Sequence, residues 1–266
     1  PDHLDRYSSM VQYREAKARI GLNMKEGDFL VLNGDDTELM GLSDRFSSEV
    51  VYFSRRGPVR GAYVEDGGIR LRFKDKDLMI SLQGMRIKGV HNIENAMAAS
   101  LMAFIAGADR EAIERILTEF RGLEHRTEFV EEIDGVNYIN DSKGTNIGAL
   151  MKSIEGFYNV ILIAGGRDKK GDFTVLRPLI KERVKTLILL GEARDKIMKS
   201  LGDLVPTLIA SDMRDAVYKA RLTASPGDTV LLSPGCASFD MFRDFEDRGR
   251  VFKNIVRELK GGIRQD

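Results

Sequence analysis

The chain has 266 residues, 42% of them hydrophobic and 31% charged, a balance typical of a soluble globular protein of one or two domains. Its 41 basic residues equal its 41 acidic residues in number, which disfavours a nucleic-acid-binding protein because such proteins usually carry a basic surplus. The single cysteine, Cys236, excludes an internal disulfide, and no apolar run reaches the ~18 residues that span a bilayer. We expect a cytoplasmic protein without a membrane partner, and the missing initiator Met before Pro1 indicates a segment of a longer chain.

The first half of the chain predicts a small sheet followed by helices. A short helix is expected before residue 20, and apolar runs predict strands at 29–33, 50–53, 69–73 and 78–82. The run at 69–73 alternates apolar and charged residues, as a half-exposed antiparallel strand does. Residues 91–120 show helical spacing. Their two apolar stripes consist of Ile93, Met97, Leu101 and Phe104, and of Ile113, Ile116 and Phe120.

The second half alternates apolar runs with helical stretches, and Gly122 marks the seam between the halves. The expected strands are 136–140, 160–165, 186–190, 207–210 and 229–233. This alternation predicts an α/β fold with a parallel sheet. We therefore expect a complete doubly wound domain in the second half and part of an α/β domain in the first.

Three of the predicted strands end in unusual loops at 141–146, 165–170 and 233–238. Ligands gather at the carboxyl ends of parallel strands, and the N–H groups of helix N-termini favour anions. Hydroxyl groups, lysines and bare backbone in these loops indicate a pocket for carboxylates or phosphates. In a purely structural interpretation, Thr145 and Ser238 are helix N-caps, Gly165-Gly166 is a tight turn and the lysines are solvated. Three such loops on one sheet edge favour a site.

Two further sets of polar residues fit either a ligand-binding role or a purely structural one. Asn92 and Asn95 lie three residues apart at the start of a helix, where carboxamides suit the edge of a nucleobase but also serve as a polar first turn. Arg126 at the seam suits a phosphate or a surface ion pair. A phosphate-binding loop that ends in Gly-Lys-Ser/Thr is absent from the 266 residues.

Taken in order along essentially the whole chain, these motifs resemble the Mur ligase family. The runs that carry the resemblance are Asp2-His3-Leu4-Asp5-Arg6-Tyr7, Tyr13-Arg14-Glu15-Ala16-Lys17, Asn33-Gly34-Asp35-Asp36, His91-Asn92 to Asn95-Ala96, Gly122-Leu123-Glu124-His125-Arg126, Asn140-Asp141-Ser142-Lys143-Gly144-Thr145-Asn146, Gly165-Gly166, and Leu232-Ser233-Pro234-Gly235-Cys236-Ala237-Ser238 with Phe245 and Arg248-Gly249. The Asp-Ser-Lys-Gly-Thr-Asn and Ser-Pro-Gly-Cys-Ala-Ser runs point to the branch that adds D-glutamate. The Asp-Asn-Pro-Arg run of the branch that adds a diamino acid is absent.

The resemblance implies a domain organisation and a reaction. Family members have three domains, and this chain would begin inside the central one, after its phosphate loop. Residues 1–122 would be the rest of the central P-loop ATPase-like, ATP-binding domain, and residues 123–266 the complete Rossmann-like C-terminal domain that binds D-glutamate. The parent enzyme would use ATP and Mg²⁺ to activate the alanyl carboxylate of UDP-N-acetylmuramoyl-L-alanine as an acyl phosphate. The D-glutamate amine would then form the amide in peptidoglycan synthesis, whereas the segment alone, expected to be a monomer, would be inactive.

The resemblance also assigns roles to individual residues. His3 and Lys17 would bind metal, Lys17 after carbamylation, and Lys143 would take part in catalysis with them. Asn92, Asn95, Arg126 and Asp141 would contact ATP. The D-glutamate site would consist of Lys143, Thr145, Lys169, Ser238 and Phe245, with Lys170 as the alternative to Lys169.

Two alternative functions remain. A related amide ligase such as a folylpolyglutamate synthase is disfavoured by the Asp-Ser-Lys-Gly-Thr-Asn run. A stand-alone, non-catalytic module that binds a nucleotide or glutamate is favoured by the missing phosphate loop.

Overall fold

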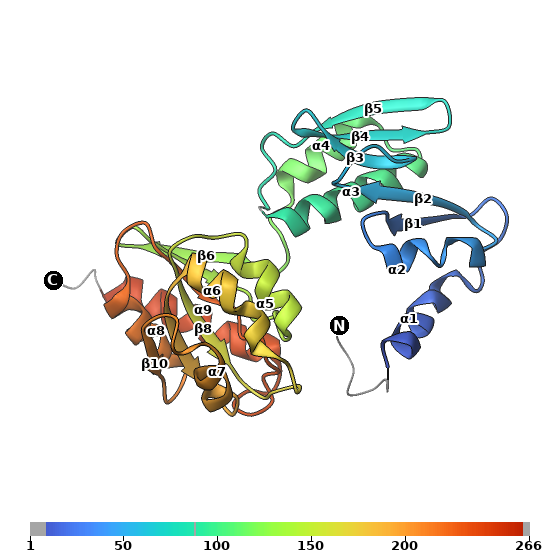
Figure 1. Ribbon diagram of the computed structural model, residues 1–266. Helices are drawn as coiled ribbons and strands as arrows, with labels where there is room; N and C mark the ends of the chain where they lie inside the picture. The colour runs from blue at the N-terminus through green and yellow to red at the C-terminus, as the bar shows by residue number, and fades with distance from the viewer. Residues whose placement is uncertain (1–8, 88, 263–266) are drawn as a thin grey trace. The chain divides into compact units, whose positions relative to one another are not determined.

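The computed structural model describes residues 9–87 and 89–262, and it divides into two compact units, Pro1–Arg121 and Gly122–Asp266 (Figure 1). The first unit contains a five-stranded sheet, and the second contains a six-stranded sheet. Both are flanked by helices, so the predicted α/β class is confirmed. Within the described ranges, no helix has the length and apolar character needed to cross a membrane.

The sheet of the first unit has the strand order β1-β2-β3-β4-β5. Its strands are β1 (Phe29–Asn33), β2 (Glu49–Ser54), β3 (Gly61–Glu65), β4 (Gly68–Phe73) and β5 (Lys76–Ser81). The first three are parallel, whereas β4 and β5 are antiparallel to their neighbours. Strand β4 alternates buried and more exposed residues as predicted.

Strand β3 was not predicted, because its apolar run is only three residues long and lies between Gly61 and Glu65. Gly61 has φ +144°, and a Cβ there would lie 1.9 Å from the Tyr52 carbonyl oxygen. Only glycine lets the two backbones approach this closely. The residue that weakens the strand signal in the sequence is therefore the one that allows β3 to pair with β2.

The helices of the first unit are α1 (Met10–Ala18), η1 (Arg19–Gly21), α2 (Thr37–Met40), η2 (Ser43–Arg45), α3 (Val90–Ile105) and α4 (Arg110–Glu119). Figure 1 shows α3 and α4 beside the sheet. Met97, Leu101 and Phe104 of α3 are buried in the core, as the first predicted stripe requires. The second predicted stripe is wrong beyond Ile113, because Ile116 and Phe120 are 59% and 42% exposed.

The sheet of the second unit has the order β10-β9-β8-β11-β7-β6. Its strands are β6 (Glu128–Ile133), β7 (Val136–Asn140), β8 (Val160–Gly165), β9 (Val184–Leu190), β10 (Thr207–Ile209) and β11 (Thr229–Leu232). The strands from β7 to β11 are parallel, and β6 is an antiparallel edge strand. The prediction missed β6 because Glu128, Glu131 and Glu132 interrupt its apolar pattern.

The helices of the second unit cover both faces of this sheet. They are α5 (Ile147–Ile154), η3 (Phe173–Leu176), α6 (Arg177–Arg183), α7 (Arg194–Leu201), α8 (Met213–Thr223) and α9 (Phe245–Gly262). Ile161 and Ile163 of β8 join a core with α8 and α9, whereas Leu162 and Ala164 join a second core with α5, α6 and α7. Successive strand residues point to opposite faces, so the buried β8 run supports both cores. The predicted doubly wound architecture is confirmed.

Candidate functional site

Three loops of the second unit meet at the carboxyl edge of its sheet. They follow β7, β8 and β11, which are neighbours in the order β8-β11-β7. Gly235 N donates to Gly144 O at 2.8 Å and Gly165 N donates to Pro234 O at 2.9 Å. An isolated β-bridge also joins Arg167 to the loop after β11. The loop after β11 is thus bonded to both others, and the loops form one rim.

Arg248 of α9 holds two of these loops together. Its side chain is 2% exposed, and its guanidinium donates to Ser142 Oγ and Ser142 O at 2.9 Å and to Cys236 O at 3.2 Å. Ser142 Oγ in turn donates to Phe245 O at 2.8 Å. Burial lowers the pKa of Arg248 to about 10, so the guanidinium is charged at neutral pH. Its charge-assisted bonds fix the shape of the rim.

Asp141, the first residue after β7, is a buried acid on this rim. Its Oδ2 accepts from Ser233 Oγ at 2.8 Å and its Oδ1 accepts from Thr127 N at 3.2 Å. Burial raises the pKa of Asp141 to about 6, although both hydrogen bonds and the charge of Arg126 oppose the rise. Gly144 is required beside it, since a Cβ there would lie 2.5 Å from Asp141 Oδ2. Asp141 therefore lies within electrostatic reach of the exposed Arg126, the other residue of this unit assigned to the nucleotide.

Lys143 and Phe245, assigned to D-glutamate by the resemblance, are in contact. The Lys143 ammonium lies 3.7 Å from the centre of the Phe245 ring, a cation–π arrangement. The backbone N of Lys143 also donates to His125 O at 3.0 Å. The carboxyl edge of the sheet therefore presents a cation held against an aromatic ring, and such a cation suits a carboxylate ligand.

Thr145 and Ser238 are not the helix N-caps of the structural interpretation. Asn146 caps α5, because its side chain accepts from Ala149 N at 2.8 Å. Asp244, whose Oδ1 accepts from Asp247 N at 2.6 Å, stands before α9. Thr145 is half-buried in the turn before α5, and Ser238 is 2% exposed. That structural interpretation of both residues is therefore wrong.

Lys169 lies on the loop after β8, which ion pairs attach to the segment after β9. Arg167 pairs with Glu192 at 3.3 Å, and Asp168 pairs with Lys196 at 2.7 Å. Lys169 itself is exposed, as is Lys170. The ion pairs hold the residues that precede Lys169 against Glu192 and against Lys196 of α7.

The remaining assigned residues belong to the first unit or lie outside the described ranges. Asn95 Nδ2 donates to Asn92 Oδ1 at 3.4 Å near the start of α3, so the two carboxamides face each other. Lys17 of α1 is exposed, with its ammonium 5.5 Å from the Tyr13 ring. It lines a largely apolar cavity of about 780 Å³ between α1 and β1. His3 lies outside the described residues.

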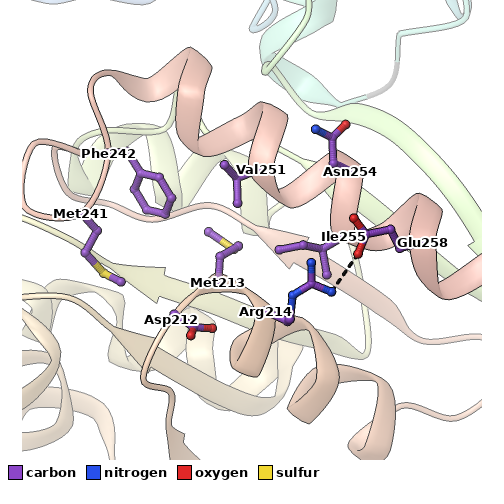
Figure 2. Close-up of a pocket in the computed structure, with 9 residues that line it drawn as sticks. All are labelled: Asp212, Met213, Arg214, Met241, Phe242, Val251, Asn254, Ile255 and Glu258. Carbon is purple, nitrogen blue, oxygen red and sulfur yellow. Dashed lines mark hydrogen bonds and ion pairs between the residues drawn. The ribbon is translucent and has the colours of Figure 1, made fainter.

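A separate pocket of about 420 Å³ lies between α8, α9 and the segment before α9. Figure 2 shows Met213, Met241 and Phe242 on its apolar wall and the Arg214–Glu258 ion pair, 2.7 Å long, at its side. None of these residues was assigned a role from the sequence. Phe242 is linked to the rim, because its N donates to Ser238 O at 2.9 Å.

Among the described residues, one group of acids and histidine is close enough to hold a metal ion. The ligand atoms of Glu124, His125 and Glu128 lie within 4.8 Å of one another. The ammonium of Lys253 already contacts both carboxylates and offsets part of their charge. The sequence predicted no role for this group or for Arg248. Arg248 appeared only as part of a run that resembles the Mur ligase family.

Comparison with known proteins identifies both units. Residues 1–103 match the Mur ligase middle domain, and residues 125–236 match the Mur ligase glutamate ligase domain. The UDP-N-acetylmuramoylalanine--D-glutamate ligases of Geotalea uraniireducens (strain Rf4) and Acidobacterium capsulatum are 43% and 44% identical over 98% of the chain. The chain spans about 58% of the length of each of these relatives.

Solved structures show the same fold at low sequence identity. A MurF ligase from Thermotoga maritima in complex with ADP has a TM-score of 0.70 and 15% identity, covering 97% of this chain and 60% of that one. A pseudomurein peptide ligase type C from Methanothermus fervidus has a TM-score of 0.72 and 18% identity, covering 97% of this chain and 61% of that one. With two matched domains and these relatives, the chain belongs to the Mur ligase family.

Proposed function

We propose that this chain is the ATP-binding remainder and the D-glutamate-binding domain of a ligase that joins D-glutamate to UDP-N-acetylmuramoyl-L-alanine. The observation that carries the proposal is the rim of the second unit, where Lys143 lies on Phe245 beside the buried Asp141. The names and 43–44% identity of the relatives support the same reaction. We place the protein in the cytoplasm, as a monomer that acts on this nucleotide-linked substrate.

The residues present fit one end of ATP and not the other. Asn92 and Asn95 offer donors and acceptors for the adenine edge, and Arg126 offers a bidentate donor for phosphate or ribose oxygens. The chain has no Gly-Lys-Ser/Thr loop for the β- and γ-phosphates. When bound, ATP with Mg²⁺ supplies the phosphoryl group that activates the alanyl carboxylate. His3 and Lys17, the latter as a carbamate, would hold metal in the complete site.

Residues of the second unit would bind and orient D-glutamate. The Lys143 ammonium would pair with a carboxylate of the amino acid, while Phe245 limits the space beneath it. Ser238 and Thr145 would donate hydroxyl hydrogen bonds, and Lys169 or Lys170 would pair with the second carboxylate. Such fixed cations lower the barrier by holding the amine next to the activated carboxylate. Asp141 would accept from the bound nucleotide when it is ionised.

A chimera tests the proposal. The chain is grafted in place of its matching segment in the Geotalea uraniireducens relative, and phosphate release is measured with ATP, Mg²⁺, UDP-N-acetylmuramoyl-L-alanine and D-glutamate. We expect release that requires D-glutamate and is not supported by L-glutamate or by folate substrates. Release independent of D-glutamate, or dependent on folate, would assign the chain to another reaction.

A second candidate is a non-catalytic module that binds D-glutamate or a nucleotide by itself. The absent phosphate loop favours it. It predicts that the 266-residue chain binds its ligand by calorimetry whereas the chimera is folded and inactive. An active chimera rejects this candidate.

A further inference from the structure

Lys253 is a buried cation whose two acidic partners lie around His125. Its side chain is 7% exposed, and its ammonium contacts Glu124 and, at 3.0 Å, Glu128. The other oxygen of Glu128 accepts from His125 N and from Asn140 Nδ2, both at 2.9 Å. Burying an ammonium is costly unless it is paired. These bonds therefore fix α9 to the strands β6 and β7 and to the residues before them.

The His125 ring packs on the face of α9 that carries Lys253. Phe245, Gly249 and Lys253 are four residues apart and so share one face of the helix. A Cβ at Gly249 would lie 2.1 Å from His125 Nδ1, so only glycine admits the imidazole there. The ring meets Phe245 edge-on, with centroids 6.0 Å apart and planes at 86°. One helix face thus meets the His125 ring at Phe245 and Gly249 and carries Lys253 one turn further on.

His125 also contacts Lys143 and is bound by Asn140. His125 O accepts from Lys143 N at 3.0 Å. Asn140 Nδ2 lies 2.9 Å from His125 Nδ1, while Asn140 Oδ1 accepts from Ser142 N at 3.1 Å. Because this orientation gives the amide nitrogen to the imidazole, Nδ1 is an acceptor and the ring is neutral with its proton on Nε2. A proton on Nδ1 would replace that hydrogen bond with two opposed donors.

We propose that Lys253 is a positioning residue of the D-glutamate site: by offsetting the negative charge of Glu124 and Glu128 it keeps His125 uncharged, and His125 holds the Lys143–Phe245 pair in place. That the ligand is D-glutamate rests on the proposed function, whereas the contacts among Lys253, Glu128 and His125 are independent of it. Lys253 pairs with Glu128, and Glu128 accepts from the backbone N–H of His125. His125 in turn contacts Lys143 through its backbone carbonyl and Phe245 through its ring.

Because charged groups surround His125, ligand binding should depend on pH. Burial lowers the pKa of His125; Glu124, Glu128 and Glu246 oppose this effect, and Lys253 adds to it. Removing the Lys253 charge leaves two carboxylates beside the imidazole, so the pKa of His125 rises. Protonation then breaks the Asn140 bond at a pH at which the wild-type ring is neutral. A purely structural lysine would not change the pH at which ligand binding weakens.

The test compares Lys253→Met with Lys260→Met in the 266-residue chain. Lys260 lies on the same helix and pairs with Glu131 at 2.7 Å, but its side chain is 47% exposed. NMR follows the His125 ring, one of three histidines, and calorimetry gives the Kd of D-glutamate at pH 8 and pH 6. For Lys253→Met we expect the pKa of His125 to rise and the Kd at pH 6 to rise by about tenfold, with a smaller change at pH 8. Lys260→Met should alter neither.

Glu124→Gln keeps the test decisive should Lys253→Met fail to fold. Glu124 is 59% exposed, so its replacement leaves no buried group unpaired. Because its charge raises the pKa of His125, the variant should shift the titration downward. Unchanged titration in either folded variant, or a shift in Lys253→Met without any change in Kd, would overturn the positioning role. Wild-type protein that binds no D-glutamate at either pH, together with a folded chimera that releases no phosphate, would instead overturn the proposed function.

Discussion

Ser233 Oγ donates a 2.8 Å hydrogen bond to Asp141 Oδ2 across 92 residues of sequence. The bond joins the ends of the neighbouring parallel strands β11 and β7. It stabilises the ionised acid, but burial has the larger effect and raises the pKa of Asp141 to about 6 from the ordinary 3.8. The acid is therefore placed where its charge is disfavoured, which is common at functional sites.

Asp141 should make the protein less stable as the pH rises. Below the unfolded pKa, both states hold the proton. Between about pH 4 and pH 6 the unfolded chain loses its proton first, so unfolding becomes easier by up to about 3 kcal/mol before levelling off above pH 6. Asp141→Asn should remove this trend in urea unfolding measured from pH 4 to pH 7. Asp134→Asn, at a 67% exposed side chain, should preserve it, and equal slopes for both variants would contradict the assignment.

Replacing Lys143 should affect the reaction far more than the fold. Its ammonium contacts the Phe245 ring at 3.7 Å, a contact worth about 0.5–2 kcal/mol. We expect Lys143→Ala in the chimera to lower kcat/KM for D-glutamate by at least roughly a hundredfold, with a loss of unfolding free energy within that range. Lys152→Ala, which removes a 46% exposed lysine of α5, is the control. An unchanged rate would remove Lys143 from the site.

Arg248 should be a stability residue of the second unit. Arg248→Met leaves the Ser142 and Cys236 carbonyls without their donor, and unmaking buried charge-assisted bonds costs about 3–5 kcal/mol. Urea unfolding should show a loss of this size, and Arg257→Met, at an exposed position of the same helix, should cost less than about 0.5 kcal/mol. Equal losses in the two variants would show that the carbonyls find other donors.

The 266-residue chain alone should hydrolyse no ATP and bind it weakly. In the proposed site, Asn92, Asn95 and Arg126 would contact the base and one part of the phosphate chain, but the 266 residues hold no Gly-Lys-Ser/Thr loop to enclose the β- and γ-phosphates. Calorimetry should therefore give similar, weak affinities for ATP and AMP. Tight binding of ATP, or a strong preference for ATP over AMP, would mean that residues outside the proposed set hold the phosphates.

The sequence predicted the elements whose signal is local. Strand β8 is a continuous apolar run, and its two faces join two cores, so pattern alone identified it. The three loops could be placed on one rim because parallel strands present their carboxyl ends at the same edge. Strand β6 and strand β3 were missed because acidic residues or a glycine break their patterns. Their pairing comes from neighbouring strands, which periodicity does not register.

The supporting residues of the rim could not be predicted in the same way. Arg248 bonds to Ser142 across 106 positions, and Lys253 reaches Glu124 across 129. In the sequence, each looks like an ordinary charged residue of an amphipathic helix. The burial that makes them informative exists only after α9 has packed on the sheet. The helix caps are a different case: Asn146 and Asp244, rather than Thr145 and Ser238, accept from a backbone N–H three residues along the chain, which is a local contact.

Cys236 offers a way to watch the rim open. It is the only cysteine, it is fully buried, and burial raises the pKa of its thiol to about 12. Since the thiolate is the reactive form, native protein should resist thiol reagents, and labelling should require opening of the loop after β11.

The Cys236 carbonyl accepts two of the Arg248 bonds, so Arg248→Met should accelerate labelling at least roughly tenfold. A tenfold change corresponds to a loss of about 1.4 kcal/mol in the free energy of opening. Arg257→Met should label at the wild-type rate. Rapid labelling of the wild-type protein would show that the rim is already open, and equal rates in all three proteins would show that Arg248 does not hold it closed.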